Sequence, residues 1–221
     1  MEAKKFIEPE LGSRKVVIMT SLHIKGAFDA AWWPSILKEL KVSGCPRNLN
    51  YLSQGYFSQR TAVMSTNSVS IEKRVKKGCP QGSCCRPGFW NLLYNSLLKL
   101  EYTSHSKVIA FADDLIILTK GESIVEAENY TNFKLRKFSE WTHDNKLKFN
   151  EHKSKVMLVS SRKRKEKKER EIYLNNRILQ NVNSLKYFGI IFDSKITFRD
   201  HINYVQENAE SYYLLFQNRQ K

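Results

Sequence analysis

The stretch of residues 108–119, which reads VIAFADDLIILT, determines how the fold is interpreted. Two apolar runs flank only Asp113 and Asp114, and this pattern predicts a β-hairpin with two carboxylates at its tip. Neighbouring side chains of a strand point to opposite faces, so both aspartates serve one site only if the turn redirects them. Carboxylates placed in this way suit hard divalent cations such as Mg²⁺. The simpler alternative is a turn without a cation, because Asp is common in turns.

Strand-like and helical patterns alternate around this hairpin and predict an α+β fold. Residues 15–24 are expected to form a buried strand, and residues 122–145 an amphipathic helix. Further helices are expected at residues 28–42, 49–57, 87–102 and 202–216, hairpins at 61–75 and 171–179, and strands at 155–160 and 185–192. The sequence shows no internal repeat and no linker rich in Pro, Gly or Ser. A single domain is therefore expected over residues 1–221, with no second domain.

The loop GCPQGS at residues 78–83 is a second candidate for a binding site. Its glycine and proline residues permit close approach of the backbone to a ligand, and Gln81 offers an amide that can hydrogen-bond to a sugar or a base. An ordinary loop that leads into the following helix is the alternative.

Basic residues outnumber acidic ones, with 37 Lys and Arg against 22 Asp and Glu and a net charge of +15. This surplus favours a polyanionic partner, either nucleic acid or an acidic membrane surface, and argues against small acidic substrates. Residues 121–180 hold 15 of the basic residues, and seven of these belong to the run RKRKEKKER at residues 162–170. This run has three possible interpretations: contacts to phosphate groups, a localisation signal, or an ordinary solvated loop.

The cysteines and the N-terminal residues indicate an intracellular protein. Cys45, Cys79, Cys84 and Cys85 form no CxxC pair, so no structural zinc site is expected. Residues 1–13 lack the apolar stretch of a secretory signal, and no apolar run approaches the roughly 18 residues of a membrane span. The chain is expected in the nucleus or cytoplasm, neither secreted nor in a membrane. Its oligomeric state stays open.

Five short segments of the sequence occur in a specific order, and together they are more specific than any one of them. They are IKGAFD at residues 24–29, GCPQGS at 78–83 with FWN at 89–91, FADD at 111–114, the lysine-bearing residues 149–157, and KYFG at 186–189. Together they resemble the reverse transcriptases of non-LTR retrotransposons, especially the insect elements that insert into ribosomal RNA genes. The resemblance extends over nearly the whole chain.

The resemblance implies a right-hand polymerase palm, in which an antiparallel sheet is backed by helices, with partial fingers and a truncated thumb. It implies RNA-directed DNA synthesis from deoxynucleotides on an RNA template and a DNA primer, with two Mg²⁺ (or Mn²⁺) ions. Asp113 and Asp114 match the family's catalytic metal ligands. The other matched positions are Lys153 beside the leaving pyrophosphate, Phe28, Gln81 and Gly82 at the nucleotide, and Phe188 and Gly189 in the hairpin that holds the primer.

Two departures from the family pattern bear on activity. His23 stands at the position of the first catalytic aspartate, and imidazole is a poor ligand for Mg²⁺. Cys84, Cys85 and Arg86 follow GCPQGS, where the family usually has small residues and a glycine. We therefore expect a weakly active or inactive palm fragment from a decayed or truncated element. The alternatives are a non-catalytic nucleic-acid-binding remnant and a relic without a role.

Overall fold

The structure is a computed structural model that describes residues 2–100, 104–161 and 170–218, with side chains up to residue 210. The chain divides into two compact units. The first consists of Met1–His23, Tyr102–Arg136 and Glu151–Lys221, and the second of Ile24–Glu101 and Lys137–Asn150. Each unit contains both helices and strands, which confirms the expected α+β class.

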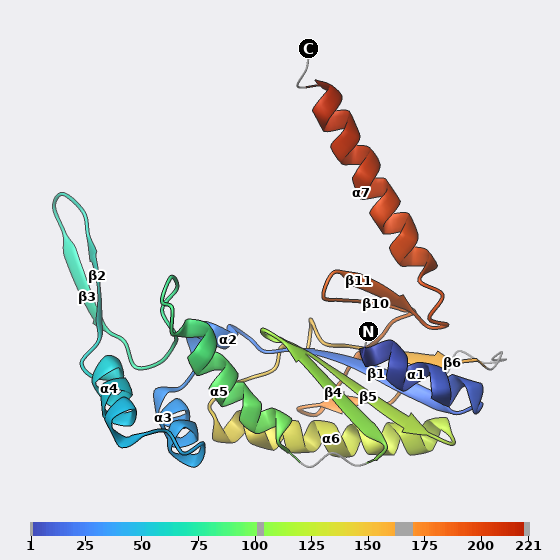
Figure 1. Cartoon of the computed structure of the whole chain (residues 1–221), viewed down its shortest axis with the longest axis horizontal. Coiled ribbons are helices and arrows are strands. Elements are labelled where there is room, and N and C mark those ends of the chain that lie inside the picture. The colour runs from blue at the N-terminus through green and yellow to red at the C-terminus, as the bar shows by residue number, and fades with distance from the viewer. Residues whose placement is uncertain (1, 101–103, 162–169, 219–221) are drawn as a thin grey trace. The chain divides into compact units, whose positions relative to one another are not determined.

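The first unit is built on a five-stranded sheet with the strand order β4-β5-β1-β6-β9 (Figure 1). Its strands are β1 (Val16–His23), β4 (Ser106–Phe111), β5 (Asp114–Gly121), β6 (Lys155–Ser160) and β9 (Gln180–Asn181). The first four pair antiparallel, as expected, whereas the two-residue β9 runs parallel to β6. The sequence of β1, VVIMTSLH, is largely apolar because this strand has a neighbour on both edges and is covered on both faces.

Alternate side chains of the sheet pack into two different layers. On one face, Val17 and Met19 of β1 pack with side chains of α1 (Glu2–Gly12) and of a C-terminal hairpin. The cluster comprises Ala3, Ile7, Val17, Met19, Ile116, Leu118, Met157, Val159, Leu185, Tyr187 and Phe192. On the other face, the hydroxyl of Thr119 contacts that of Thr131 in α6 (Ile124–Asp144), whose residues fall in both units.

Three smaller elements complete the first unit. The hairpin of β10 (Ser184–Tyr187) and β11 (Ile190–Asp193) contributes to the core and is followed by α7 (Arg199–Asn218). A shorter hairpin joins β7 (Tyr173–Leu174) to β8 (Arg177–Ile178). Its turn residues, Asn175 and Asn176, have positive φ values of 50° and 63°, which a two-residue hairpin turn of this kind favours.

The second unit is mainly helical. Its elements are α2 (Ala27–Ala30), α3 (Trp33–Val42), α4 (Arg47–Phe57), the hairpin of β2 (Thr61–Ser65) and β3 (Ser70–Arg74), and α5 (Arg86–Leu98). Aromatic side chains hold these helices together, with Trp33 stacked on Phe57 at 5.2 Å between ring centroids. Trp90 of α5 is fully buried and lies against Tyr94, with 5.1 Å between the rings. Trp33 and Trp90 are therefore both part of the core of this unit.

Two expectations about single elements were wrong. Residues 28–42 form two helices rather than one, because Pro34 has no N–H to donate to the carbonyl of Ala30 in a continuous helix. Residues 185–192 form both strands of the β10–β11 hairpin rather than the one strand expected from the apolar pattern, because Phe188 and Gly189 turn the chain with φ values of 49° and 79°, where the resemblance implied a hairpin.

The tip of the acidic hairpin also differs from the expectation by one residue. Phe111 pairs with Asp114, so the turn consists of Ala112 and Asp113, and Asp114 is already the first residue of β5. Ala112 adopts a positive φ of 52° in this turn. Helix α1 was not expected at all, and most of the basic run at residues 162–170 lies outside the described residues.

Candidate active site

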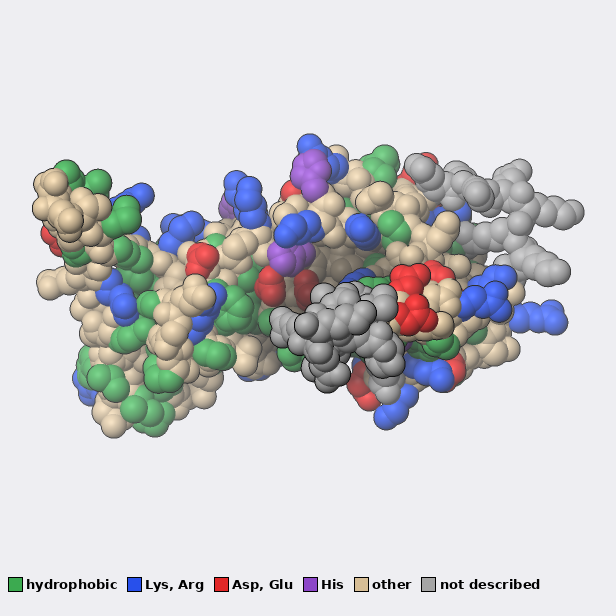
Figure 2. Space-filling view, turned by 90° about the horizontal axis from the view of Figure 1, so that it is seen from above, with side chains coloured by type: hydrophobic (Ala, Val, Ile, Leu, Met, Phe, Trp, Pro, Cys, Tyr) green, Lys and Arg blue, Asp and Glu red, His purple; other side chains and the backbone are tan. Residues whose placement is uncertain are grey.

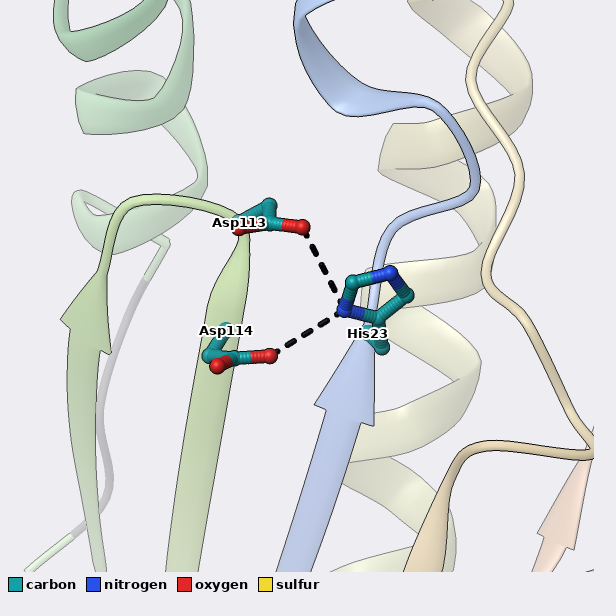
Figure 3. Close-up of side chains that lie close together, drawn as sticks. All are labelled: His23, Asp113 and Asp114. Atoms are coloured by element: carbon teal, nitrogen blue, oxygen red, sulfur yellow. Dashed lines mark hydrogen bonds and ion pairs between the residues drawn. The ribbon is translucent and has the colours of Figure 1, made fainter. Parts of the chain in front are cut away.

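The end of β1 and the start of β5 bring His23, Asp113 and Asp114 together (Figure 3). His23 and Asp114 are direct partners in the antiparallel register, so their side chains project from the same face of the sheet. The imidazole Nδ1 lies 3.1 Å from Oδ1 of Asp114 and 3.4 Å from Oδ2 of Asp113. Both predicted carboxylates and the predicted histidine therefore meet, although His23 and Asp114 are 91 residues apart in the chain.

All three side chains are reachable from solvent, with exposed fractions of 24% for His23, 35% for Asp113 and 49% for Asp114. Figure 2 likewise shows histidine and acidic side chains adjoining one another on the surface. Tyr187 is buried, and its hydroxyl donates to the carbonyl of Ile109 at 3.3 Å. Burial, and then the Asp114 carboxylate, raise the pKa of Tyr187 to about 12, so this phenol stays neutral at physiological pH.

These three groups can hold a divalent ion, because one ligand atom from each lies within 4.8 Å of the other two. Their chemistry fits a pair of Mg²⁺ ions poorly, however. Mg²⁺ takes oxygen ligands in near-ideal octahedral geometry, and one of the three donors here is an imidazole nitrogen. The donor set has two carboxylates and so lacks a third anionic group to offset the charge of two cations.

Lys153 lies at the end of the sheet that carries His23, Asp113 and Asp114. Strand β6 begins at Lys155, which pairs with Ser21 of β1, and Lys153 is exposed in the turn just before it. This position is compatible with a basic side chain near the acidic cluster. Its expected place beside a leaving pyrophosphate stays a prediction.

Phe28 and the loop of residues 78–83 meet in the second unit. The amide of Cys79 donates to the Phe28 carbonyl at 2.8 Å, and the indole of Trp33 donates to the Gly78 carbonyl at 2.7 Å. Gln81 and Gly82 are exposed at the outer part of the loop. The residues expected at the nucleotide are thus neighbours, while their binding roles stay predictions.

Arg86 makes a contact that the sequence did not reveal. Its guanidinium carbon lies 4.4 Å from the centroid of the Phe28 ring, within the ~6 Å of a cation–π contact. The other neighbour of that ring is Trp90, at 5.4 Å between centroids. Arg86 was noted as an unusual residue after GCPQGS, and its contact with Phe28 depends on how α2 packs against α5.

Phe188 and Gly189 occupy the turn of the β10–β11 hairpin. Phe188 is 60% exposed, and its ring lies 4.0 Å from that of Phe111, which is 54% exposed. Phe111 was not among the expected site residues. The sequence signal that could have identified Phe111 is its position directly before the acidic turn. In the structure, the hairpin register sets it opposite Asp114.

Comparison with known sequences identifies what the chain is similar to. Residues 7–192 match the family described as reverse transcriptase (RNA-dependent DNA polymerase). A 115 kDa protein in the type-1 retrotransposable element R1DM of Drosophila melanogaster is 30% identical over 203 residues, which cover 91% of this chain and 19% of that protein. The RNA-directed DNA polymerase from the mobile element jockey of the same species is 27% identical, over 88% of this chain and 22% of that protein. The chain thus spans about a fifth of the length of these relatives.

Solved structures show the same fold. The telomerase of Candida tropicalis, in complex with a TWJ fragment of telomeric RNA, superimposes with a TM-score of 0.63 at 12% identity and covers 89% of this chain and 32% of the telomerase. The apo form of that telomerase gives a TM-score of 0.62 at 11% identity, over 89% of this chain and 35% of the telomerase. Among the described residues of this chain, no helix has the length and apolar character needed to cross a bilayer.

Proposed function

Because the chain belongs to the reverse transcriptase (RNA-dependent DNA polymerase) family, with relatives in insect non-LTR retrotransposons, we propose that its sheet is a polymerase palm that receives an RNA template and a DNA primer. We propose further that this chain synthesises DNA weakly or not at all. The proposal has two parts, which are measured separately. One is that the chain binds the template and primer, and the other is that it has lost DNA synthesis.

The observation that carries the loss of synthesis is the position of His23. The register of β1 and β5 sets this imidazole against Asp114, at the corner where the resemblance expects a third carboxylate. Nucleotidyl transfer by this family uses divalent cations to offset negative charge on the attacking and leaving oxygens. A neutral imidazole offers those cations no charge, and an imidazolium repels them.

The surrounding residues receive roles in the same proposal. Asp113 and Asp114 remain the two anionic ligands, and Lys153 is the cation for the leaving pyrophosphate. Phe28, Gln81 and Gly82 would bound the site for the deoxynucleotide. Phe188 and Gly189 would support the primer strand, with Phe111 stacked on Phe188.

Arg86 is a second reason to expect low activity. Its side chain lies over the face of Phe28, the residue expected to contact the nucleotide sugar. A guanidinium stacked on an aromatic ring is held by cation–π attraction as well as by packing. Access to that ring therefore requires displacement of Arg86.

Affinity for a template–primer duplex rests on charge rather than on the catalytic residues. A net charge of +15 supports contacts to phosphate that are independent of sequence and weaken as salt is raised. Such binding belongs in the nucleus or cytoplasm, where nucleic acid is available. Substitution of both aspartates by asparagine should leave duplex affinity intact.

Primer extension on an RNA template, with Mg²⁺ and separately with Mn²⁺, tests the proposal. The chain is compared with His23→Asp, Arg86→Gly and the double variant, and His143→Asp is the control because that side chain is 90% exposed. We expect little product from the unmodified chain and the control, more from His23→Asp, and most from the double variant. Robust extension by the unmodified chain would overturn the proposed loss. If no substitution raises extension although the chain binds the duplex, His23 is not the cause of the lost synthesis.

A further inference from the structure

The acidic cluster has a donor set that differs in kind from a pair of Mg²⁺ sites. We propose that His23, Asp113 and Asp114 bind one metal ion of the kind that accepts nitrogen ligands, above all Zn²⁺. We propose that they bind this ion in preference to Mg²⁺. The inference rests on the geometry of these three groups and does not require that the chain make DNA.

The separations of the donor atoms are compatible with a tetrahedral ion. The Nδ1 atom of His23 lies 3.4 Å from Oδ2 of Asp113 and 3.1 Å from Oδ1 of Asp114. A tetrahedral Zn²⁺ with bonds of about 2.0–2.1 Å needs ligand atoms roughly 3.3 Å apart. An octahedral Mg²⁺ with bonds of similar length needs adjacent ligands about 2.9 Å apart. The 3.4 Å distance is nearer to the tetrahedral value, and the 3.1 Å distance lies midway between the two values.

The chemistry of the donors points the same way. Imidazole suits Zn²⁺ and its first-row neighbours, whereas Mg²⁺ binds carboxylate, carbonyl and water oxygens. Two carboxylates and one neutral imidazole balance the charge of one divalent ion. Three protein ligands with solvent access leave a fourth position open, as in zinc sites that bind water or a substrate. The partial exposure of all three side chains provides that access.

The backbone holds the donors in place before an ion arrives. His23 and Asp114 are fixed as partners by the β1–β5 register, and Asp113 is held in the two-residue turn between β4 and β5. Sites built on strands are more precisely placed than sites on loops. The ion would therefore replace the imidazole–carboxylate contacts with metal bonds and would need no rearrangement of the sheet.

Co²⁺, which takes the same ligands as Zn²⁺ and absorbs visible light, is the probe. Cys84 and Cys85 are exposed with 3.8 Å between their sulfur atoms, so the titration uses a Cys84→Ser/Cys85→Ser background to remove thiolate binding. We expect one Co²⁺ to give the intense visible bands of a four- or five-coordinate ion. Zn²⁺ should displace it in stoichiometric amounts, and a millimolar excess of Mg²⁺ should not.

The variants His23→Asp and His23→Gln test the ligand itself. Each should weaken Zn²⁺ and Co²⁺ binding on the order of 100-fold, and His23→Asp should bind Mg²⁺ more tightly than the unmodified chain. His143→Ala is the control and should bind Co²⁺ normally. Unchanged Co²⁺ binding in both His23 variants, or displacement of Co²⁺ by equimolar Mg²⁺, would overturn the inference. Neither readout depends on DNA synthesis, so failure here is separate from failure of the proposed function.

Discussion

His23 and Asp114 are paired across β1 and β5, and the imidazole Nδ1 of the first lies 3.1 Å from a carboxylate oxygen of the second. His23 therefore lies where a cation bound by the two aspartates would lie, and not at a remote position on the strand. One side chain both removes a negative charge from the site and contacts the charges that remain.

This arrangement predicts a stability change in the variant His23→Asp. Three carboxylates would then adjoin, and each like-charge pair at about 4 Å costs on the order of 1 kcal/mol in a water-like medium. Without divalent ions we expect the melting temperature to fall by about 2–4 °C for each kcal/mol lost, and to recover when Mg²⁺ is added. Thermal unfolding with and without Mg²⁺ measures both effects, with His143→Asp as control. An unchanged melting temperature that is also insensitive to Mg²⁺ would contradict the prediction.

Phe188 should be more important for binding than for stability. Its φ of 49° is unfavourable for a bulky residue, and Asn adopts this conformation more readily. The substitution Phe188→Asn relieves that strain but loses the contact with Phe111, so we expect a stability change within about 1 kcal/mol. Affinity for a template–primer duplex should fall severalfold. A fluorescence-anisotropy titration checks the affinity, and a variant that binds as tightly as the unmodified chain would remove Phe188 from the interface.

Gly78 should tolerate a side chain less well than Gly82, because only Gly78 lies close to another part of the backbone. Both have positive φ values, of 94° and 82°. A Cβ at Gly78 would also lie 2.9 Å from the carbonyl oxygen of Asp29, whereas a Cβ at Gly82 would meet no atom within 4 Å. We expect Gly78→Ala to lower the free energy of unfolding by about 1–2 kcal/mol more than Gly82→Ala does. Urea unfolding of the two variants decides this, and equal losses would show that strain alone is responsible.

Asp193 should make stability depend on pH. Burial raises the pKa of its carboxyl, but hydrogen bonds from the Thr197 and Lys195 amides, the Thr197 hydroxyl and the Phe198 amide together hold the pKa below its ordinary value. A depressed pKa adds stability above the unfolded value of about 3.9, and this stability is lost as pH falls through the folded pKa.

We therefore expect Asp193→Asn to be about 1 kcal/mol less stable than the unmodified chain at pH 7. The difference should shrink as pH falls below about 4. Melting temperatures from pH 7 to pH 3 measure it, with the exposed Asp200→Asn as the control. A difference that stays constant over this range would show that the carboxylate charge is not involved.

The cysteines should differ strongly in reactivity. Burial raises the pKa of the Cys79 thiol to about 11, against a smaller opposing effect of Arg86, and the side chain is only 2% exposed. Cys84 and Cys85 are exposed. In a short pulse of iodoacetamide at pH 8, we expect alkylation of Cys84 and Cys85 but of Cys79 only after unfolding. Peptide mass spectrometry gives the answer, and early labelling of Cys79 would mean that the loop opens in the native state.

Most elements were predictable because their signals are local. The strand expected at residues 155–160 is β6, and the helix expected at 122–145 is α6 with its ends shifted by one or two residues. The break at Pro34 is also encoded locally, by the missing N–H of the proline. Helix α1 is different, since it contains Pro9, a residue that argues against a helix, and its stability comes from burial of Ala3 and Ile7 on the sheet.

The sequence by itself determined which residue types were available: two adjacent aspartates, a histidine at the end of an apolar strand, and an arginine after GCPQGS. Only the tertiary structure decided that Ala112 and Asp113 form the turn, that Nδ1 of His23 lies against both carboxylates, and that Arg86 covers Phe28. The contacts of His23 and Arg86 join residues far apart in the chain. Strand register and helix packing set their distances, and no local preference of the backbone encodes either one.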